Sequence, residues 1–336
     1  MANFQDWEVS AVKEVTYGTA VTTEDFLEWG DFKPFVPEVG IVQGVGMRSA
    51  VRAPISGRRV SGLGKQAAGP ITVELANKGQ GWLYEAALGT GTSTLVSGST
   101  YQEVFTLADT LPSYTVQFNT RQIDGTSAPV TFLGSVVDSW ELSVENNGIG
   151  SLVTTWDSRT WSTAIAAAST SYASGVNLFS FKDLSVSTGT LTLATTTALA
   201  SSVTALDGVR SVKISCANNL VKDRFYAGAS GLKGKPIPGT RLITGELQVD
   251  FLANTLRDAF LAQTAMTLLV TLTGSGALST GYETIQVALS AIMLDGDMPE
   301  GSKDGAPSQP IKFTALADLT AAQVVQVVRR TAETAI

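Results

Sequence analysis

The sequence predicts a mainly β fold made of two tandem β-sandwich or half-barrel domains, each with one short α-helix, that are related by internal duplication. Three observations support this prediction. Apolar and polar residues alternate along many short segments, as they do in half-buried strands. Turn dipeptides such as Asp124-Gly125 and Asp207-Gly208 separate these segments. The chain has 336 residues, more than one hydrophobic core usually spans.

The predicted strands are the segments in which the alternation is clearest. Every second residue is aliphatic or aromatic, and the residues between are mostly Thr, Ser, Gln, Asn, Asp or Glu. The segments are 71–75, 114–119, 139–145, 246–251 and 268–273. Successive side chains of a strand point to opposite faces of a sheet, so each segment would bury one face and leave the other polar.

Helical periodicity is confined to two short segments. Residues 80–88 place an apolar stripe on one face before Gly89 ends the run. Residues 254–262 show a similar stripe behind Asn254 or Thr255, either of which suits a helix N-cap. The sequence therefore predicts one short helix in each half of the chain.

The two predicted helices follow similar strands, which indicates an internal repeat. Residues 69–75 (GPITVEL) precede the first helix, and residues 245–251 (GELQVDF) precede the second. Glu74 and Asp250 fall at matching places in these strands. A glycine-rich basic segment comes before each strand, so three features recur in the same order. This recurrence favours a duplication.

The repeat sets the expected domain limits, with a linker where the composition is rich in Ala, Ser and Thr. The expected units are an N-terminal arm (1–25), a first β domain (26–158), a linker (159–176), a second β domain (177–318) and a C-terminal arm (319–336). The Ser/Thr-rich segment 185–202 alternates like a hairpin, and we expect it to form an exposed flap. The C-terminal arm is rich in Val, which favours a strand.

Composition excludes several classes of site. The chain has no histidine and one cysteine, Cys216, so a Ser-His-Asp or Cys-His nucleophile and a His or Cys metal cage are excluded within one chain. We expect a protein that is not an enzyme and that has no cofactor and no metal site. The net charge of −7 disfavours nucleic-acid binding through a basic face. No apolar run has the roughly 18 residues that a membrane helix needs, so we expect no membrane partner.

Two sets of charged residues are candidate functional residues. The basic, glycine-rich segments would be solvated loops or contact elements, and we favour contacts, because a basic loop on an acidic protein complements another copy of that protein. Their residues are Arg48, Arg52, Arg58, Arg59, Lys65, Lys222, Arg224, Lys233, Lys235 and Arg241. The second set consists of acids on polar strand faces, which form an ordinary wet sheet face or line a channel. Its residues are Glu74, Asp250, Glu141, Glu145 and Glu246.

Several motifs, taken in order, resemble the major tail tube proteins of long-tailed (siphovirus-type) bacteriophages, in their two-domain form. The motifs are KEVTYGT at 13–19, FLE at 26–28, the basic segment leading into GPITVEL at 69–75, FLG at 132–134 with WELS at 140–143, and NLVKDRF at 219–225. The similarity covers nearly the whole chain. Segments 160–175 and 185–202 depart from it, being looser and longer than expected.

The resemblance implies a structural protein of the virion tail, assembled in the bacterial host cytoplasm. It implies packed β-sheets with a short helix, and inner sheets of neighbouring subunits that join into a barrel around a lumen. Three two-domain chains would form a ring with pseudo-sixfold symmetry, and the basic loops and arms would hold stacked rings together. The expected partners are other copies, a tape-measure protein, and tail terminator and tip proteins, while DNA passes through the lumen without specific binding.

Two other classes of function stay open at this point. One is a β-sandwich capsid decoration or surface-adhesion module, although such a module does not need basic segments at matching places. The other is a carboxylate enzyme such as a glycoside hydrolase, which needs two acids roughly 5 to 10 Å apart in a cleft. Glu74 and Glu141 are the acids that we would mutate to test that function.

Overall fold

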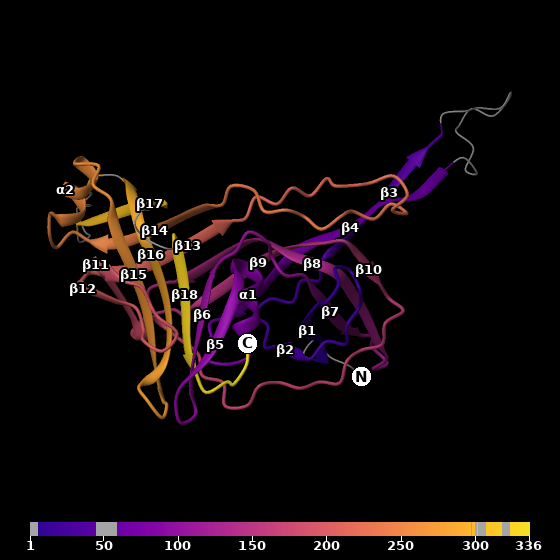
Figure 1. The fold of residues 1–336 in the computed structure, drawn as a ribbon, viewed down its shortest axis with the longest axis horizontal. Coiled ribbons are helices and arrows are strands. Elements are labelled where there is room, and N and C mark those ends of the chain that lie inside the picture. The colour runs from indigo at the N-terminus through magenta and orange to yellow at the C-terminus, as the bar shows by residue number, and fades with distance from the viewer. Residues whose placement is uncertain (1–5, 45–58, 297, 300, 302–306, 318–322) are drawn as a thin grey trace.

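The computed structural model describes all residues except 1–5, 45–58, 297, 300, 302–306 and 318–322. The described residues form eighteen strands and two α-helices, and all pairs between the named strands are antiparallel (Figure 1). This confirms the predicted mainly β fold. The paired strands are connected into one large sheet that does not close on itself.

The elements of the first half run from β1 to β10. They are β1 (Glu8–Lys13), β2 (Asp25–Leu27), β3 (Val36–Gln43), β4 (Arg59–Glu74), α1 (Gly81–Leu88), β5 (Gly89–Ser97), β6 (Thr100–Leu107), β7 (Tyr114–Arg121), β8 (Ser127–Val144), β9 (Ser151–Ser158) and β10 (Thr160–Ser162). The elements of the second half are a short 3₁₀ helix (Phe181–Asp183), β11 (Leu184–Thr192), β12 (Ser201–Ala205), β13 (Val209–Ala217), β14 (Leu242–Asp250), α2 (Thr255–Leu261), β15 (Met266–Ala277), β16 (Tyr282–Gly296), β17 (Ser308–Ala315) and β18 (Val325–Thr331).

One layer of the fold, which we call the long sheet, runs through both halves. Its strand order is β3–β4–β9–β8–β13–β14–β17–β16, so each half contributes four strands. The halves meet where β13 pairs with the last residues of β8, from Val212 opposite Val144 to Ala217 opposite Ser139. Within the described residues, β3 and the end of β16 are the two outer edges of this layer.

The remaining strands form a second layer in each half. The order is β2–β1–β7–β8–β10 in the first half and β12–β11–β15–β16–β18–β6–β5 in the second. The long strands β8 and β16 belong to both layers, because their first residues pair in the second layer and their last residues pair in the long sheet. Packing of the two layers is consistent with the predicted β-sandwich.

The strand pairings of the first half recur in the second half in the same order. β4 pairs with β3 and β9, β8 with β7 and β9, and β1 with β7. In the same way β14 pairs with β13 and β17, β16 with β15 and β17, and β11 with β15. The β5–β6 hairpin has no counterpart after α2 among the described residues. A duplication would leave such a pattern, but common descent of the halves and the domain limits stay predictions.

Both predicted helices are present. α1 begins one residue after the expected start and ends at Gly89, whose positive φ of 112° suits glycine. α2 begins at Thr255 after Asn254. The predicted C-terminal strand is also present as β18, which lies between β16 and β6.

The expectation of an exposed flap at 185–202 was wrong. Its ends form β11 and β12, which pair as predicted, but the connection between them packs against the second layer. Ala194 and Ala200 are buried there. The side-chain amides of Gln326 and Gln286 exchange hydrogen bonds with the backbone N–H and C=O of these two alanines. These buried amides bind the loop backbone as a neighbouring strand would.

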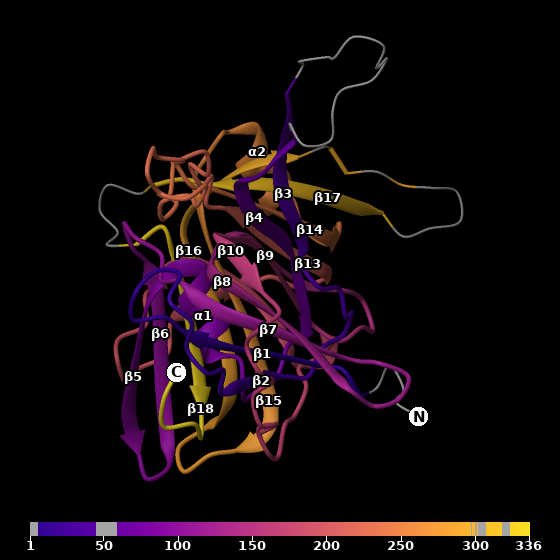
Figure 2. The same cartoon turned by 90° about the vertical axis from the view of Figure 1, so that its right-hand side faces the viewer.

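The halves share one continuous hydrophobic core. Buried residues from both halves belong to it, among them Trp82, Trp156, Ile214 and Phe313. β3 (Val36–Gln43) and the first residues of β4 (Arg59–Gln66) form a hairpin that extends out of this body beyond β9. We call this hairpin the arm; it is a different segment from the expected N- and C-terminal arms. The arm lies at one end of the molecule, and the turns of β5–β6 and β15–β16 lie at the opposite end (Figure 2).

Candidate functional site

The long sheet has one apolar face and one polar face. Residues directly opposite each other on antiparallel strands point to the same side of a sheet. Starting from Glu74 on β4, the pairings connect a single row of neighbours across seven strands. The row is Glu74, Ser151, Ser143, Lys213, Glu246, Lys312 and Asp295. We call the side of the sheet that carries this row the polar face.

Four of the five predicted channel acids lie on the polar face. Glu74 is in the row, Glu141 is two residues from Ser143 on β8, and Glu246 and Asp250 lie on β14. Glu145 follows β8 directly and is exposed. Strands that are far apart in sequence therefore bring four of these acids to one surface. Their role as channel-lining residues stays a prediction.

Sequence reasoning missed three charged residues of the row itself. Lys213, Lys312 and Asp295 stand in the row with Glu246, and both lysines lie directly beside it. The signal was present in the alternation of β13 and β17, but only a pairing register could show that these lysines share a face with the acids.

Ion pairs partly neutralise the acids. The Lys213 ammonium lies 2.9 Å from a Glu141 carboxylate oxygen, and the Arg210 guanidinium lies 2.7 Å from Asp250. All four side chains keep substantial exposure, so the pairs are worth little in stability. The first half contributes only an acid and serines to the row, whereas the second half alternates acids with lysines. The polar face is thus mixed in charge in its second half.

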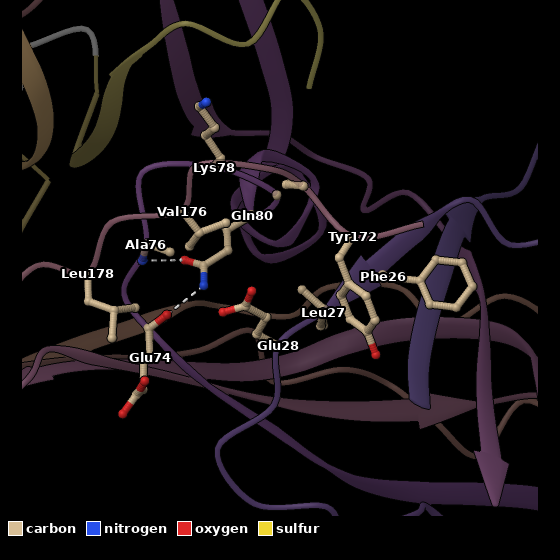
Figure 3. Close-up of a pocket in the computed structure, with 12 residues that line it drawn as sticks. Phe26, Leu27, Glu28, Glu74, Ala76, Lys78, Gln80, Tyr172, Val176 and Leu178 are labelled. Carbon is tan, nitrogen blue, oxygen red and sulfur yellow. Dashed lines mark hydrogen bonds between the residues drawn. The ribbon is translucent and has the colours of Figure 1, made fainter. Parts of the chain in front are cut away.

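Glu74 is the last residue of β4, shortly before α1, and it lines a small pocket (Figure 3). The side-chain amide of Gln80 fills one side of the pocket, accepting a hydrogen bond from the Ala76 N–H (3.0 Å) and donating one to the Glu74 carbonyl (2.5 Å). Its walls combine apolar side chains such as Leu27 with polar ones such as Glu28. Both the oxygen and the nitrogen of the Gln80 amide are hydrogen-bonded to the backbone. We therefore interpret this pocket as structural, because Gln80 fixes the backbone at the end of β4.

Two residues of the first basic segment, Arg59 and Lys65, lie within the described part of the chain. Arg48, Arg52 and Arg58 lie outside the described residues. Arg59 is the first residue of β4, and Lys65 is exposed on the same strand. The Lys65 backbone N–H donates to the Gly231 carbonyl at 3.2 Å, so the base of the arm is bonded to the second basic segment.

The second basic segment, residues 218–241, folds back on itself, and we call it the ribbon. Two isolated bridges, Val221–Ile237 and Phe225–Lys233, connect its two sides. Four of its basic side chains bond within the chain. Lys222 pairs with Asp138 (2.6 Å), Lys233 pairs with Asp157 (2.5 Å), Arg224 donates to the Lys235 carbonyl, and Arg241 donates to Asn218 and to the Ala108 carbonyl.

Lys233 is the most unusual of these residues, because its side chain is fully buried. Burial raises the pKa of Asp157, and the neighbouring ammonium of Lys233 opposes that rise. Burial also lowers the pKa of Lys235. The ribbon is therefore fixed to β9 of the first half. The inter-ring role of the ten basic residues stays a prediction.

Among the described residues, no helix has the length and apolar character needed to cross a membrane. The same residues hold no group of three or more His, Cys, Asp or Glu side chains arranged for a metal ion. The buried thiol of Cys216 has a pKa raised to about 11, chiefly by burial, so it is a poor nucleophile.

A family model described as phage tail tube protein matches residues 6–315. No curated protein matches the chain.

Proposed function

The chain belongs to the phage tail tube protein family, and from that premise we propose that it forms stacked rings that build the hollow tail tube through which DNA leaves the virion. The family makes it a structural component of the virion tail. Ring composition, stacking and DNA passage are our proposal.

The long sheet is the observation that carries this proposal. It holds four strands from each half in the same pairing order and has two unlike outer edges, β3 and the end of β16. Open edges invite pairing with another chain, and closure into a barrel removes them. A contact between two unlike edges is head-to-tail and closes into a ring when the rotation allows it.

The junction inside the chain supports a specific form of ring. β13 of the second half pairs with β8 of the first half. In the matching pairing order, β3 corresponds to β13 and β16 to β8. We propose that β3 of one copy pairs beside the end of β16 of the next copy. Three chains would then supply six similar units, and the two halves, with limits near 26–158 and 177–318, would descend from a duplication.

In this ring the polar face lines the lumen. Closely spaced DNA phosphates adhere to basic surfaces through counterion release. The acids of the polar face outnumber its basic residues, and Lys213 and Arg210 are already paired with acids. Such a wall supports passage of DNA without specific binding. A tape-measure protein inside the tube, and terminator and tip proteins at its ends, are the other partners that we propose.

Electron microscopy and native mass spectrometry of the purified protein at rising concentration test the proposal. We expect rings of three chains of 35.2 kDa each, with six similar lobes, followed by hollow tubes. Charge reversal at Arg58 and Arg59 should block stacking and leave rings intact. Rings of six chains would contradict the trimer, and solid monomeric particles at every concentration would favour a decoration module instead.

A further inference from the structure

We propose that the side chains of Lys233 and Asp157 condense to an amide, an isopeptide bond that links the ribbon covalently to β9. The Lys233 Nζ lies 2.5 Å from Asp157 Oδ1, and the two side chains are 0% and 5% exposed. Two reactive groups that are held in contact need no further approach or reorientation, which removes much of the barrier to a reaction between them. The bond is a modification site within one chain, and it does not depend on the proposed function.

The pair is poorly satisfied as two charges. An ammonium group has three N–H donors. Among the described residues, the acceptors near Lys233 Nζ are Asp157 Oδ1 and, at 3.5 Å, the side-chain oxygen of Gln66. Asp157 Oδ2 is buried and has no hydrogen-bond partner in the described part of the chain. Buried charges with few partners are costly, so a neutral acid and amine, and a neutral amide after them, are favoured at this place.

The backbone on both sides of Lys233 is fixed to other segments. Leu232 forms a bridge with Lys65 of β4, and the carbonyl of Gly234 accepts a hydrogen bond from the Tyr17 hydroxyl at 3.4 Å. The lysine side chain is therefore directed at β9 in one orientation. Its burial also keeps bulk water away, which protects an amide formed there from hydrolysis.

The reaction is a dehydration that needs no outside reagent. A proton passes from Nζ to Oδ1, which leaves a neutral amine beside a neutral carboxylic acid. The Nζ lone pair then forms a bond to Cγ of Asp157, as a lysine nucleophile does at other carbonyl carbons. One carboxyl oxygen takes a second proton from Nζ, its bond to Cγ breaks, and it leaves as water. The product has one N–H, for which the Gln66 oxygen is the acceptor, and carries no charge.

The ribbon contains a second lysine–aspartate pair that serves as an internal control. Lys222 Nζ lies 2.6 Å from Asp138 Oδ2, and these side chains are 40% and 24% exposed. Groups in contact with water keep their ordinary charges at neutral pH, so no amide is expected there. The two pairs match in residue types and in separation and differ in burial. Burial is therefore the variable that the comparison isolates.

Mass spectrometry of the purified, folded protein tests the proposal. The intact mass should be lower than the mass of the sequence by one water molecule in most molecules. Trypsin does not cleave after an acylated lysine, so a peptide that contains residues 225–233 should stay joined to the peptide 122–159. Fragmentation should place the link between Lys233 and Asp157. The joined peptides distinguish this bond from loss of water within a single aspartate.

Two matched variants extend the test. Lys222→Met should still lose one water molecule, whereas Lys233→Met should keep the full mass of its sequence. On a denaturing gel Lys233→Met should also migrate more slowly than the unchanged protein, because the unchanged chain contains a closed loop and stays more compact.

Three results would decide against the isopeptide bond. The unchanged protein would have the full mass of its sequence and release the two peptides separately. Equal linkage of Lys222 to Asp138 would show that burial does not select the reacting pair. Loss of one water molecule in a folded Lys233→Met variant would place the dehydration elsewhere. If Lys233→Met does not fold, the peptide map of the unchanged protein still decides.

Discussion

The helices α1 and α2 follow matching strands in the two halves, yet they differ in burial. Seven of the eight residues of α1 are buried, whereas Leu256 is the one buried residue of α2. Two pieces of chain cover α1. The β5–β6 hairpin packs over it, and the ribbon residue Asn218 donates a hydrogen bond to the Ala87 carbonyl at its C-terminal end. The comparison teaches that a repeated local signal fixes a helix, while inserted and neighbouring segments decide how much it contributes to stability.

The β5–β6 hairpin is held by a buried ion pair between the halves. Glu103 on β6 lies 2.7 Å from Arg329 on β18, and both side chains are almost completely buried. Arg329 also donates to the Asn77 carbonyl just before α1 and lies over the Tyr84 ring of α1 at 5.9 Å. The cover of α1 therefore depends on this arginine.

Removal of Arg329 should have the largest effect on the difference between the helices. Arg329→Met leaves the Glu103 carboxylate buried without its partner, which costs about 3–5 kcal/mol in the free energy of unfolding. Urea unfolding measures this loss. Arg329→Met combined with Glu103→Leu should recover most of it. A loss no greater than that of Arg330→Met, on the neighbouring residue, would contradict the role of the pair.

Truncation of one leucine in each helix tests the comparison directly. Leu83→Ala in α1 should cost about 2–5 kcal/mol, because Leu83 is fully buried. Leu261→Ala in α2 should change the free energy by less than about 0.5 kcal/mol, since Leu261 is 60% exposed in the single chain. Equal costs in chemical denaturation of the unassembled protein would show that α2 is covered as α1 is.

Two glycines at matching places in β4 and β14 test whether the strands before the helices are packed alike. A Cβ at Gly69 would lie 2.8 Å from the Phe35 ring, and a Cβ at Gly245 would overlap the Phe313 ring. Gly69→Ala and Gly245→Ala should each cost about 1–3 kcal/mol through overpacking. Thermal unfolding measures both. A loss of stability in only one of the two variants would show that β4 and β14 are not packed in the same way.

The smallest expected effect concerns the surface of α1. Lys13 lies 2.6 Å from Glu85, and Lys13 is about half exposed. Lys13→Met should cost about 0.2–1 kcal/mol, as exposed pairs usually do. Thermal unfolding in low and in high salt measures it, and the difference between the proteins should shrink in high salt. A larger loss would mean that α1 depends on its surface contacts as well as on its cover.

Much of the fold could be predicted from the sequence because the signals are local. Alternation placed strands such as β4, β8 and β14, and an apolar stripe before Gly89 placed α1. The pairings β8–β13 and β6–β18 could not be predicted, because they join residues far apart in the chain and depend on the packing of the halves. The prediction of an exposed flap at 185–202 was wrong for the same reason, because its packing depends on distant residues such as Gln326 and Gln286.

The candidate site also has features that the sequence predicts and features that only the strand pairing shows. Acids such as Glu74 and Glu246 could be placed on polar strand faces from alternation alone. That Lys213 and Lys312 flank Glu246 required the pairing register. The burial of Lys233 against Asp157 was hidden as well, because a lysine in a glycine-rich segment is usually solvated.

The two unlike edges of the long sheet have a kinetic consequence. In the proposed ring, every open intermediate of one or two chains would leave both edges unpaired, and only the closed trimer would leave none. Intermediates would therefore be rare at equilibrium, and assembly would rise steeply above a threshold concentration. The number of chains in the ring would then follow from the curvature of the sheet, with no need for a separate protein to count subunits.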